Sequence, residues 1–347
     1  MSSRTADAAL RRLLDEGRVR AGAIDPEHAR LWESLATATE GGKRFRPDLL
    51  LSTHDALGGE LAFAAVEVGA ALELLHTAFV IHDDVIDGDH TRRGRPNVSG
   101  TFREQALADG AGAADADNYG RTAAILAGDL ALTTAVRTVA TCGAPVDMVR
   151  RLLDLFDEAL HTTAAGELAD VRLTLDLAPA SLAESVTMEA NKTGTYSFAL
   201  PLQAGAVLAG ADETTVLRLG EAGRVLGIAF QLVDDLIGVF GDSSLSGKSS
   251  TGDLRTRKQT PLLVHARTSP EWEQIRLHLG RDLGDEELAE VRRLLTTSGS
   301  RRFVEELAEA QITAARAVFD GLGFSIDFLD TMTTRPSVLV DGSEVAA

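Results

Sequence analysis

The stretch ALELLHTAFVIHDDVIDGDHTRRGRP, residues 71–96, decides how this chain folds. An almost wholly apolar run ends in four acids within seven residues, and a basic loop with Gly and Pro follows at once. Apolar residues recur at three- and four-residue spacing with no Gly or Pro from 70 to 87, so the run is predicted to be a helix. Carboxylates this dense at the end of a buried helix repel one another, and a divalent cation would relieve that repulsion.

The helical period places two of these acids, Asp83 and Asp87, on one face, one turn apart. His76 lies about two turns earlier on the same face, and Phe79 lies one turn below Asp83. Two such carboxylates can each give one oxygen to a hard cation. Mg²⁺ is usually held in this way, together with substrate phosphates.

Basic residues stand out in this chain because its formal net charge is −18. Such a charge argues against nucleic acid and anionic membrane as partners. Arg92, Arg93 and Arg95 nevertheless follow the acids directly, and guanidinium groups match phosphate oxygens well.

A second stretch repeats the arrangement. Residues 227–242, GIAFQLVDDLIGVFGD, again form an apolar run that contains paired acids, Asp234 and Asp235. A basic, Gly- and Ser-rich loop follows, with Lys248 and Lys258. Two acid-tipped helices that each lead into a basic loop predict a cavity in which metal ions link the acids to a polyphosphate.

Five motifs in order resemble those of the trans-isoprenyl diphosphate synthases, the polyprenyl synthetase family. The resemblance covers about residues 41–261. The motifs are GGKRFRP (41–47), HDDVIDGDHTRRGRP (82–96), GELAD (166–170), NKTG (191–194) and the stretch that runs from FQLVDDLIGVFGD to GDLRTRKQTP (230–261).

The resemblance implies an all-α fold of the isoprenoid synthase type, a bundle of about a dozen helices around a central cavity. We expect one domain over residues 1–347, with its core at 30–330 and polar tails at both ends. Low aromatic content, 5%, also favours close-packed helices over a sandwich or barrel. The family is usually homodimeric, so a homodimer is expected.

The resemblance also implies an activity. The enzyme would condense isopentenyl diphosphate head-to-tail with an allylic diphosphate, using three Mg²⁺ ions per active site, to give a short all-trans prenyl diphosphate. Geranylgeranyl diphosphate is favoured over farnesyl diphosphate. A terpene cyclase and a non-catalytic synthase subunit on the same fold remain alternatives. The basic residues implied to bind isopentenyl diphosphate argue against the cyclase.

Roles come with the resemblance for individual residues. The catalytic group is Asp83, Asp84, Asp87, Asp234 and Lys192, and the metal ligands are Asp83, Asp87, Asp234 and Asp235. Isopentenyl diphosphate would be bound by Lys43, Arg46, His76 and Arg93. The rest of the substrate site would be Arg92, Lys192, Thr193, Gln231, Lys248 and Lys258.

The chain departs from the family pattern at two positions. Gly238 stands where the second aspartate-rich motif usually has its last Asp, which removes one outer ligand. Glu167 stands where the family often has Gln, and a structural role for it is equally open. Product length should follow the depth of an apolar shaft. Phe79 could form its floor, and Ala78 is small where farnesyl-forming relatives often have a second aromatic.

Other features of the sequence indicate the cellular compartment of the protein. The one cysteine, Cys142, excludes an intrachain disulfide and a multi-cysteine zinc site, and it fits a reducing cytoplasm. The first residues contain no apolar segment of a secretory signal, so a cytoplasmic enzyme is expected. No uncharged apolar run of about 18 residues occurs, so no membrane span is expected.

Helices are also predicted outside the motifs. Residues 6–38 read as helical, with a helix start at Asp25-Pro26. Residues 109–118 are predicted to be a polar loop, residues 203–222 a scaffold helix, and residues 284–321 helical. The NKTG motif is expected to interrupt a helix and expose carbonyl groups.

Overall fold

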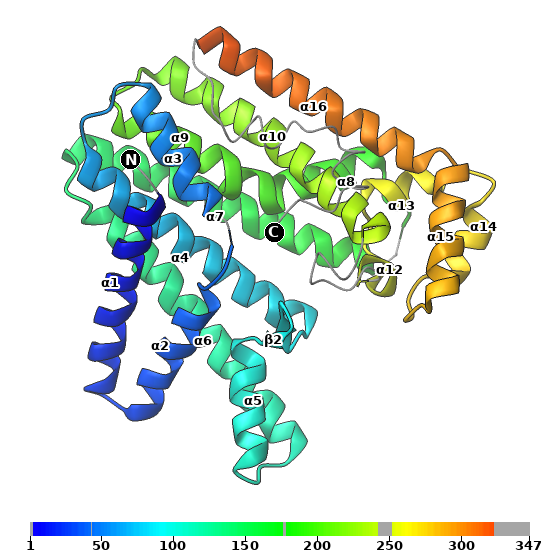
Figure 1. Cartoon of the computed structure of the whole chain (residues 1–347), viewed down its shortest axis with the longest axis horizontal. Coiled ribbons are helices and arrows are strands. Elements are labelled where there is room, and N and C mark those ends of the chain that lie inside the picture. Colours follow the sequence, from blue (N-terminus) through cyan, green and yellow to red (C-terminus); the bar gives the residue numbers. More distant parts are fainter. Residues whose placement is uncertain (1–2, 43, 176–177, 242–251, 323–347) are drawn as a thin grey trace. The chain divides into compact units, whose positions relative to one another are not determined.

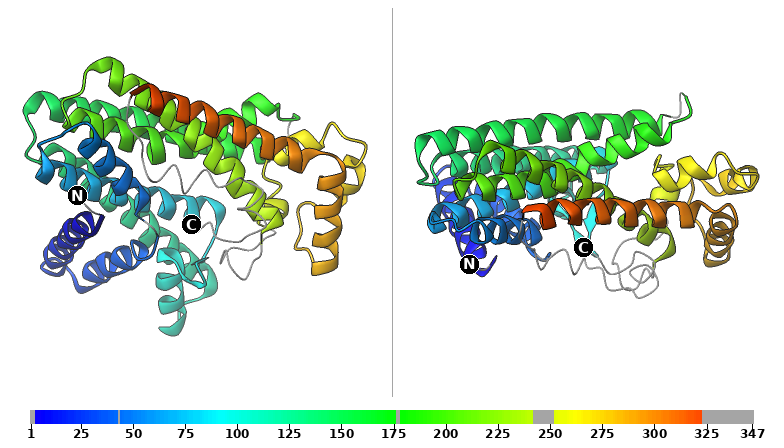
Figure 2. Two further views of the ribbon diagram at one scale, coloured as in Figure 1. Left: turned by 45° about the horizontal axis from the view of Figure 1, so that its top comes forward. Right: turned by 90° about the horizontal axis from the view of Figure 1, so that it is seen from above.

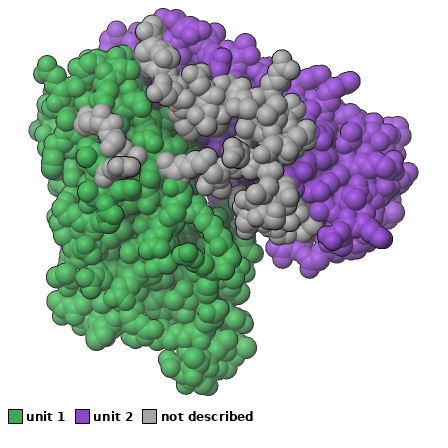
Figure 3. Space-filling view, viewed as in Figure 1, with its two compact units in different colours: residues 1–154, 204–211 green, residues 155–203, 212–347 purple. Residues whose placement is uncertain are grey.

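The computed structural model describes residues 3–42, 44–175, 178–241 and 252–322. Within these residues the chain is helical apart from one two-stranded hairpin, which confirms the all-α class. Two compact units make up the chain (Figure 3). Unit 1 comprises residues 1–154 and 204–211, and unit 2 comprises residues 155–203 and 212–347. The single-domain organisation stays a prediction.

Unit 1 consists of helices and one short β-hairpin (Figure 1). Its elements are α1 (Ser3–Gly22), α2 (Pro26–Ala38), α3 (Phe45–Ala56), α4 (Ala62–Asp87), β1 (Thr91–Arg92), β2 (Arg95–Pro96), α5 (Val98–Ala108) and α6 (Ala113–Ala140). Two further helices pass from one unit to the other, α7 (Val146–Thr174) and α9 (Leu200–Leu208).

Unit 2 contains a π-helix, η1, in which the backbone turn is wider than in an α-helix. Its elements are α8 (Leu182–Glu189), η1 (Ala190–Ala199), α10 (Glu213–Phe240), α12 (Gly252–Thr256), α13 (Pro261–Ala266), α14 (Trp272–Ile275), a 3₁₀ turn η2 (Arg276–His278), α15 (Asp285–Thr297) and α16 (Ser300–Leu322). The predicted interruption at NKTG is therefore confirmed as a π-helix over the whole motif.

Helix ends follow local chemistry. The start predicted at Asp25-Pro26 is confirmed, because the Asp25 carboxylate accepts a hydrogen bond of 2.7 Å from the Glu27 amide and Pro26 occupies the first turn. The predicted loop at 109–118 is wrong in its second half, since α6 begins at Ala113. Alanine dominates this segment and favours helix over loop.

The predicted scaffold helix over 203–222 is also wrong, because α9 ends at Leu208 and α10 begins at Glu213. Gly210 has a left-handed φ of 77°. The Asp212 side chain then caps α10 by accepting a hydrogen bond of 2.8 Å from the Thr215 amide. A left-handed glycine followed by an N-capping acid is a local signal for a new helix.

Helix α4 is the core helix of unit 1 and packs against α1, α3, α5 and α6. Both α4 and α6 are long and apolar enough to cross a membrane, judged by length and composition. The most apolar window of α4 is 78% buried inside the fold and that of α6 is 44% buried. Burial to this extent in α4 is typical of a core helix in a globular protein.

Helix α10 organises unit 2. It packs against α16 along its length, as Figures 1 and 2 both show, and against η1. Small residues allow the second contact. A Cβ atom built on Gly223 would overlap the backbone of Ala199, and one on Gly227 would overlap the Cα of Gly194. The backbones of α10 and η1 therefore touch directly.

We predict that Gly227→Ala destabilises the protein by at least about 2 kcal/mol, because the added methyl group has to displace backbone atoms of Gly194. Chemical denaturation of the purified variant measures the loss. Gly238→Ala is the matched control on the same helix. There the nearest atom is the end of the Asp253 side chain at 3.2 Å, so a neutral or slightly stabilising effect is expected. Equal losses for both variants would contradict this account of the packing.

Candidate active site

In unit 1, helix α4 ends at the acidic motif. Gly88, with a left-handed φ of 70°, caps the helix and stops it directly after Asp87. The three motif acids differ in exposure: Asp87 is exposed, Asp83 is half-buried, and Asp84 is 3% exposed. The end of α4 therefore presents two carboxylates one turn apart, as predicted, while the third turns inward.

Arg92 compensates the buried acid. Its Nε and Nη2 atoms donate to Oδ1 of Asp84 at 2.8 Å and 2.6 Å, and Nη2 lies 3.5 Å from Oδ2 of Asp83. Burial raises the pKa of Asp84, and the hydrogen bonds and charge of Arg92 oppose that shift. The structure thus brings the predicted phosphate ligand Arg92 to two acids of the predicted catalytic group, Asp84 and Asp83.

The two neighbouring arginines of the short hairpin, Arg92 and Arg93, contact different parts of unit 1. Arg92 pairs with Arg95 across the strands, and the turn runs through Arg93, with φ 52°, and Gly94, with φ 71°. Arg93 donates to the carbonyl oxygen of Glu40 at 3.1 Å. Its Nη1 atom would lie only 2.7 Å from a Cβ atom on Gly41, whose φ is 79°. A glycine at position 41 thus makes room for the Arg93 guanidinium.

His76 lies among positive charges. Burial lowers the pKa of its imidazole well below the ordinary range, and the charges of Arg46, Arg92, Arg93 and Arg44 lower it further. A neutral imidazole surrounded by guanidinium groups is suited to an anionic ligand. The predicted residues Arg46, His76 and Arg93 are therefore electrostatic neighbours, whereas Lys43 lies outside the described residues.

In unit 2, Lys192 is bonded to two acids of α7. Its Nζ atom lies 3.0 Å from Oε2 of Glu167 and 2.8 Å from Oδ2 of Asp170. Glu167 and Asp170 therefore lie on one face of α7. A Cβ atom on Gly166 would overlap the backbone nitrogen of Lys192, so α7 and η1 are in backbone contact at this point.

Lys258 and Thr193 lie close to this group in different ways. The Nζ atom of Lys258 is 4.0 Å from Oδ2 of Asp170, so the two predicted lysine ligands share one carboxylate. Thr193 is half-buried and follows Lys192 in η1. The remaining lysine of this predicted set, Lys248, lies outside the described residues.

The paired acids of α10 have different environments. Asp234 is half-buried, whereas Asp235 is 2% exposed and accepts a hydrogen bond of 3.0 Å from Nε2 of Gln231. Burial, and then the charge of Asp253, raise the pKa of Asp235 to about 7. The prediction that Asp235 binds metal stays a prediction, although its carboxylate is turned into the interior here.

Two acids near the paired acids of α10 were not predicted from the sequence. Glu189, the last residue of α8, is buried beside Asp235, and burial followed by the charge of Asp235 raises its pKa well above the ordinary range. Asp253 in α12 places Oδ2 against Gly238, 3.2 Å from where a Cβ atom would lie. A carboxylate from α12 thus lies at the position where the second motif lacks its last acid. The GDLRTRK segment that contains Asp253 was a signal for it.

The acids present fit Mg²⁺, a hard cation that prefers oxygen ligands. Among the described residues, no three His, Cys, Asp or Glu side chains lie close enough to hold a metal ion by themselves. Asp83 and Asp87 supply two carboxylates one turn apart, which matches a site completed by substrate phosphates. In unit 2, Oδ1 of Asp170 is buried and accepts no hydrogen bond from the described part of the chain.

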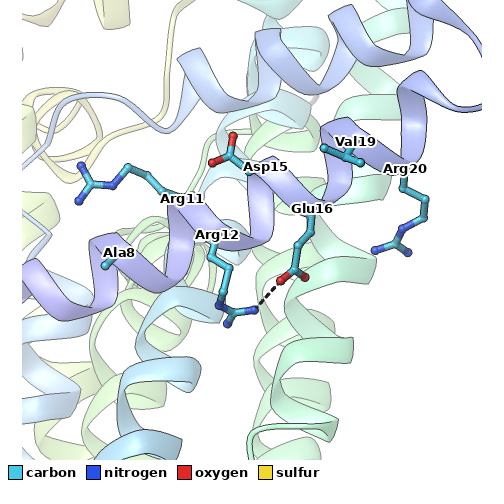
Figure 4. Close-up of a pocket in the computed structure, with 7 residues that line it drawn as sticks. All are labelled: Ala8, Arg11, Arg12, Asp15, Glu16, Val19 and Arg20. Carbon is cyan, nitrogen blue, oxygen red and sulfur yellow. Dashed lines mark hydrogen bonds and ion pairs between the residues drawn. The ribbon is translucent and has the colours of Figure 1, made fainter.

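A separate pocket lies along α1 (Figure 4). It is lined by Ala8, Arg11, Arg12, Asp15, Glu16, Val19 and Arg20. None of the predicted site residues contributes to it. We therefore do not assign the chemistry of the chain to this pocket.

Known proteins match the chain over most of its length. The family described as polyprenyl synthetase matches residues 28–296. Geranylgeranyl diphosphate synthase from Sulfolobus acidocaldarius is 34% identical over 65% of this chain, which spans 63% of that protein. Geranylfarnesyl diphosphate synthase from Aeropyrum pernix is 31% identical over 82% of this chain and 85% of that protein.

A solved structure agrees with the fold. The crystal structure of geranylgeranyl pyrophosphate synthase from Corynebacterium glutamicum, in complex with isoprenyl diphosphate and magnesium, superposes with a TM-score of 0.86. The two chains are 27% identical, and the match covers 98% of each. The predicted isoprenoid synthase fold is thereby confirmed.

Proposed function

This chain belongs to the polyprenyl synthetase family, and from that premise we propose that it condenses isopentenyl diphosphate with an allylic diphosphate in a magnesium-dependent reaction. The enzyme is a trans-prenyltransferase that makes a short- or medium-chain all-trans prenyl diphosphate. One observation carries the proposal: Arg92 is bonded to Asp84 at the acidic end of α4, and the charges of Arg46, Arg92 and Arg93 act on His76 in the same unit. Such a cation cluster favours a polyanionic substrate.

The residues of unit 1 have distinct proposed roles. Asp83 and Asp87 would hold Mg²⁺, which supplies Lewis-acid stabilisation of a departing diphosphate when it is bound. Arg46, His76 and Arg93 would bind the diphosphate of isopentenyl diphosphate. Their fixed positions would orient the double bond of that substrate for attack on the allylic carbon.

The residues of unit 2 act on the leaving group. We propose that Lys192 and Lys258 donate to oxygens of the allylic diphosphate and neutralise the negative charge that grows as its C–O bond breaks. Asp234 would hold further Mg²⁺ and complete the three proposed ions. Because Lys192 is bonded to Glu167 and Asp170, a diphosphate has to compete with these two carboxylates for the lysine.

The condensation forms one C–C bond and breaks the allylic C–O bond. The adduct then loses a proton, and the family resemblance assigns that proton to the departing diphosphate. The allylic cation has to be kept from water.

Geranylgeranyl diphosphate is the product that we favour. Phe79 is half-buried one turn before Asp83, and its small neighbour Ala78 is fully buried in α4. One large side chain at this level, in place of two, leaves a deeper space below the acids. Farnesyl diphosphate would require a shallower one.

We also propose a cytoplasmic homodimer. Helix α6 carries large apolar side chains at its surface, and among them Ile125 is 42% exposed and Leu126 is 49% exposed. An exposed apolar stripe on a long helix is suited to packing against a second copy of the chain.

The proposed activity is tested by offering the purified protein Mg²⁺, labelled isopentenyl diphosphate and dimethylallyl, geranyl or farnesyl diphosphate in turn. We expect linear prenyl diphosphates that disappear when EDTA is added. Asp83→Asn should lower turnover about a hundredfold, because one proposed metal ligand is lost. Asp89→Asn, which changes an acid outside the one-turn pair, should stay within about threefold of the wild type.

Two outcomes would contradict the proposal. A cyclic hydrocarbon made without isopentenyl diphosphate would identify a terpene cyclase. The absence of any product with every allylic primer would identify a non-catalytic subunit.

The chain-length proposal is tested with Phe79→Ala. Removing this ring should deepen the space below Asp83 and lengthen the main product by at least one isoprene unit. Chromatography after phosphatase treatment measures the length. Phe63→Ala is the matched control, because Phe63 lies on the same helix and is 69% exposed. An unchanged product from Phe79→Ala would exclude this residue as the floor.

Dimerisation is tested by sedimentation velocity of Leu126→Asp. A charge in an apolar interface should convert the dimer into a monomer. Leu277→Asp is the control, because Leu277 is 65% exposed and lies outside α6. A wild-type protein that sediments as a monomer would overturn the proposal.

A further inference from the structure

Arg44, the residue between Lys43 and Phe45, makes more side-chain hydrogen bonds than a solvated loop arginine would. Its Nε atom donates to Oδ1 of Asp7 in α1 at 2.7 Å, and Nη1 donates to Oε2 of Glu73 in α4 at 2.9 Å. Nη2 donates to the carbonyl oxygen of Thr39 at 2.7 Å, and Nη1 also lies 3.2 Å from the carbonyl oxygen of Gly41. One guanidinium thus joins α1, α4 and the loop before α3.

The backbone of Arg44 has a strained conformation. Arg44 has φ 55° and ψ 32°, a left-handed conformation that is unfavourable for a residue with a side chain. Burial alone would lower the pKa of Arg44, but the hydrogen bond that Arg44 donates to Asp7 and the charge of Glu73 raise it. The ion pairs therefore hold a strained residue in place.

Residues on both sides of Arg44 belong to the proposed isopentenyl diphosphate site. Gly41, whose carbonyl Arg44 contacts, lies against the Arg93 guanidinium. Arg44 also occupies the N-cap position of α3, where its carbonyl oxygen accepts a hydrogen bond from the Asp48 amide, and Arg46 lies in the first turn of that helix. A shift of Arg44 would therefore move Arg46 and the surface on which Arg93 rests.

We propose that Asp7 and Arg44 are positioning residues for the isopentenyl diphosphate site, an inference that rests on the proposed function. Two carboxylates neutralise the Arg44 guanidinium, so its role is to fix the loop and not to attract the substrate. Asp7 lies in α1, before residues 28–296 that match the family. The N-terminal helix is thereby part of the site architecture.

The test is Asp7→Asn, which removes the charge of the bond and keeps the shape of the side chain. We expect the KM for isopentenyl diphosphate to rise about tenfold, because one charge-assisted hydrogen bond to Arg44 is weakened. The KM for the allylic diphosphate and kcat should change less than about twofold. Hydrogen exchange of amides 39–46 should become faster in the variant.

Asp15→Asn is the matched control on the same helix. Asp15 lies in the surface pocket of α1 (Figure 4), its side chain is 74% exposed, and its ion pair is with Arg18 at 4.0 Å. The KM values of the Asp15→Asn variant, and the hydrogen exchange of its amides 39–46, should equal those of the wild type. Equal increases in the KM for isopentenyl diphosphate in both variants would overturn the inference, since they would reflect only the net charge of α1.

A second variant separates positioning from charge. Arg44→Lys keeps the positive charge but cannot bond both carboxylates and both carbonyl oxygens in one geometry. It should raise the same KM, and the double variant with Asp7→Asn should be no worse than the worse single variant. Additive effects would overturn the proposed coupling.

Different results would overturn the proposed function and this inference. A wild-type protein that does not consume isopentenyl diphosphate overturns the proposed function and this inference with it. An active wild type together with an unchanged KM in a folded Asp7→Asn variant overturns this inference alone. The fold of each variant is checked by its midpoint of thermal unfolding, which should fall by only a few degrees.

Discussion

Ion pairing of buried charges is the constraint on which the rest of this structure depends. Removing a charged side chain from water costs several kcal/mol unless an opposite charge and hydrogen bonds replace the water. Three examples among the described residues meet that requirement. Asp84 binds Arg92, and Lys192 binds the acids of α7. Arg44 binds acids from α1 and α4. Cations proposed to bind substrate and cations that fix the backbone are thus held by the same kind of bond.

These bonds have opposite consequences for a diphosphate ligand. The Arg44 pairs have no proposed substrate to compete with, so they can fix a loop permanently. The Lys192 pairs face a competing anion in the proposed reaction, so they can be exchanged. Close backbone packing would support such an exchange, because Gly166 of α7 and Gly227 of α10 both contact the backbone of η1.

The sequence allowed the fold class and the local helical placement of the candidate acids to be predicted, because dense acids and period-3.6 apolar residues are local signals. The carboxylates one turn apart at the end of α4 and the helix start at Asp25-Pro26 belong to this group. Contacts between distant segments could not be predicted. The approach of Asp253 to Gly238 depends on how α12 packs on α10, so the GDLRTRK segment marks this acid in the sequence but not its position beside Gly238.

The central claim is that a diphosphate takes Lys192 from Glu167 and Asp170 while the acids of α4 hold metal. A crystal structure with Mg²⁺, isopentenyl diphosphate and an unreactive thio analogue of the allylic diphosphate tests it most directly. We predict Nζ of Lys192 within hydrogen-bond distance of the analogue, and Mg²⁺ bound by Asp83 and Asp87. A bound analogue with Lys192 still bonded to both acids, or with no metal at α4, would contradict the account.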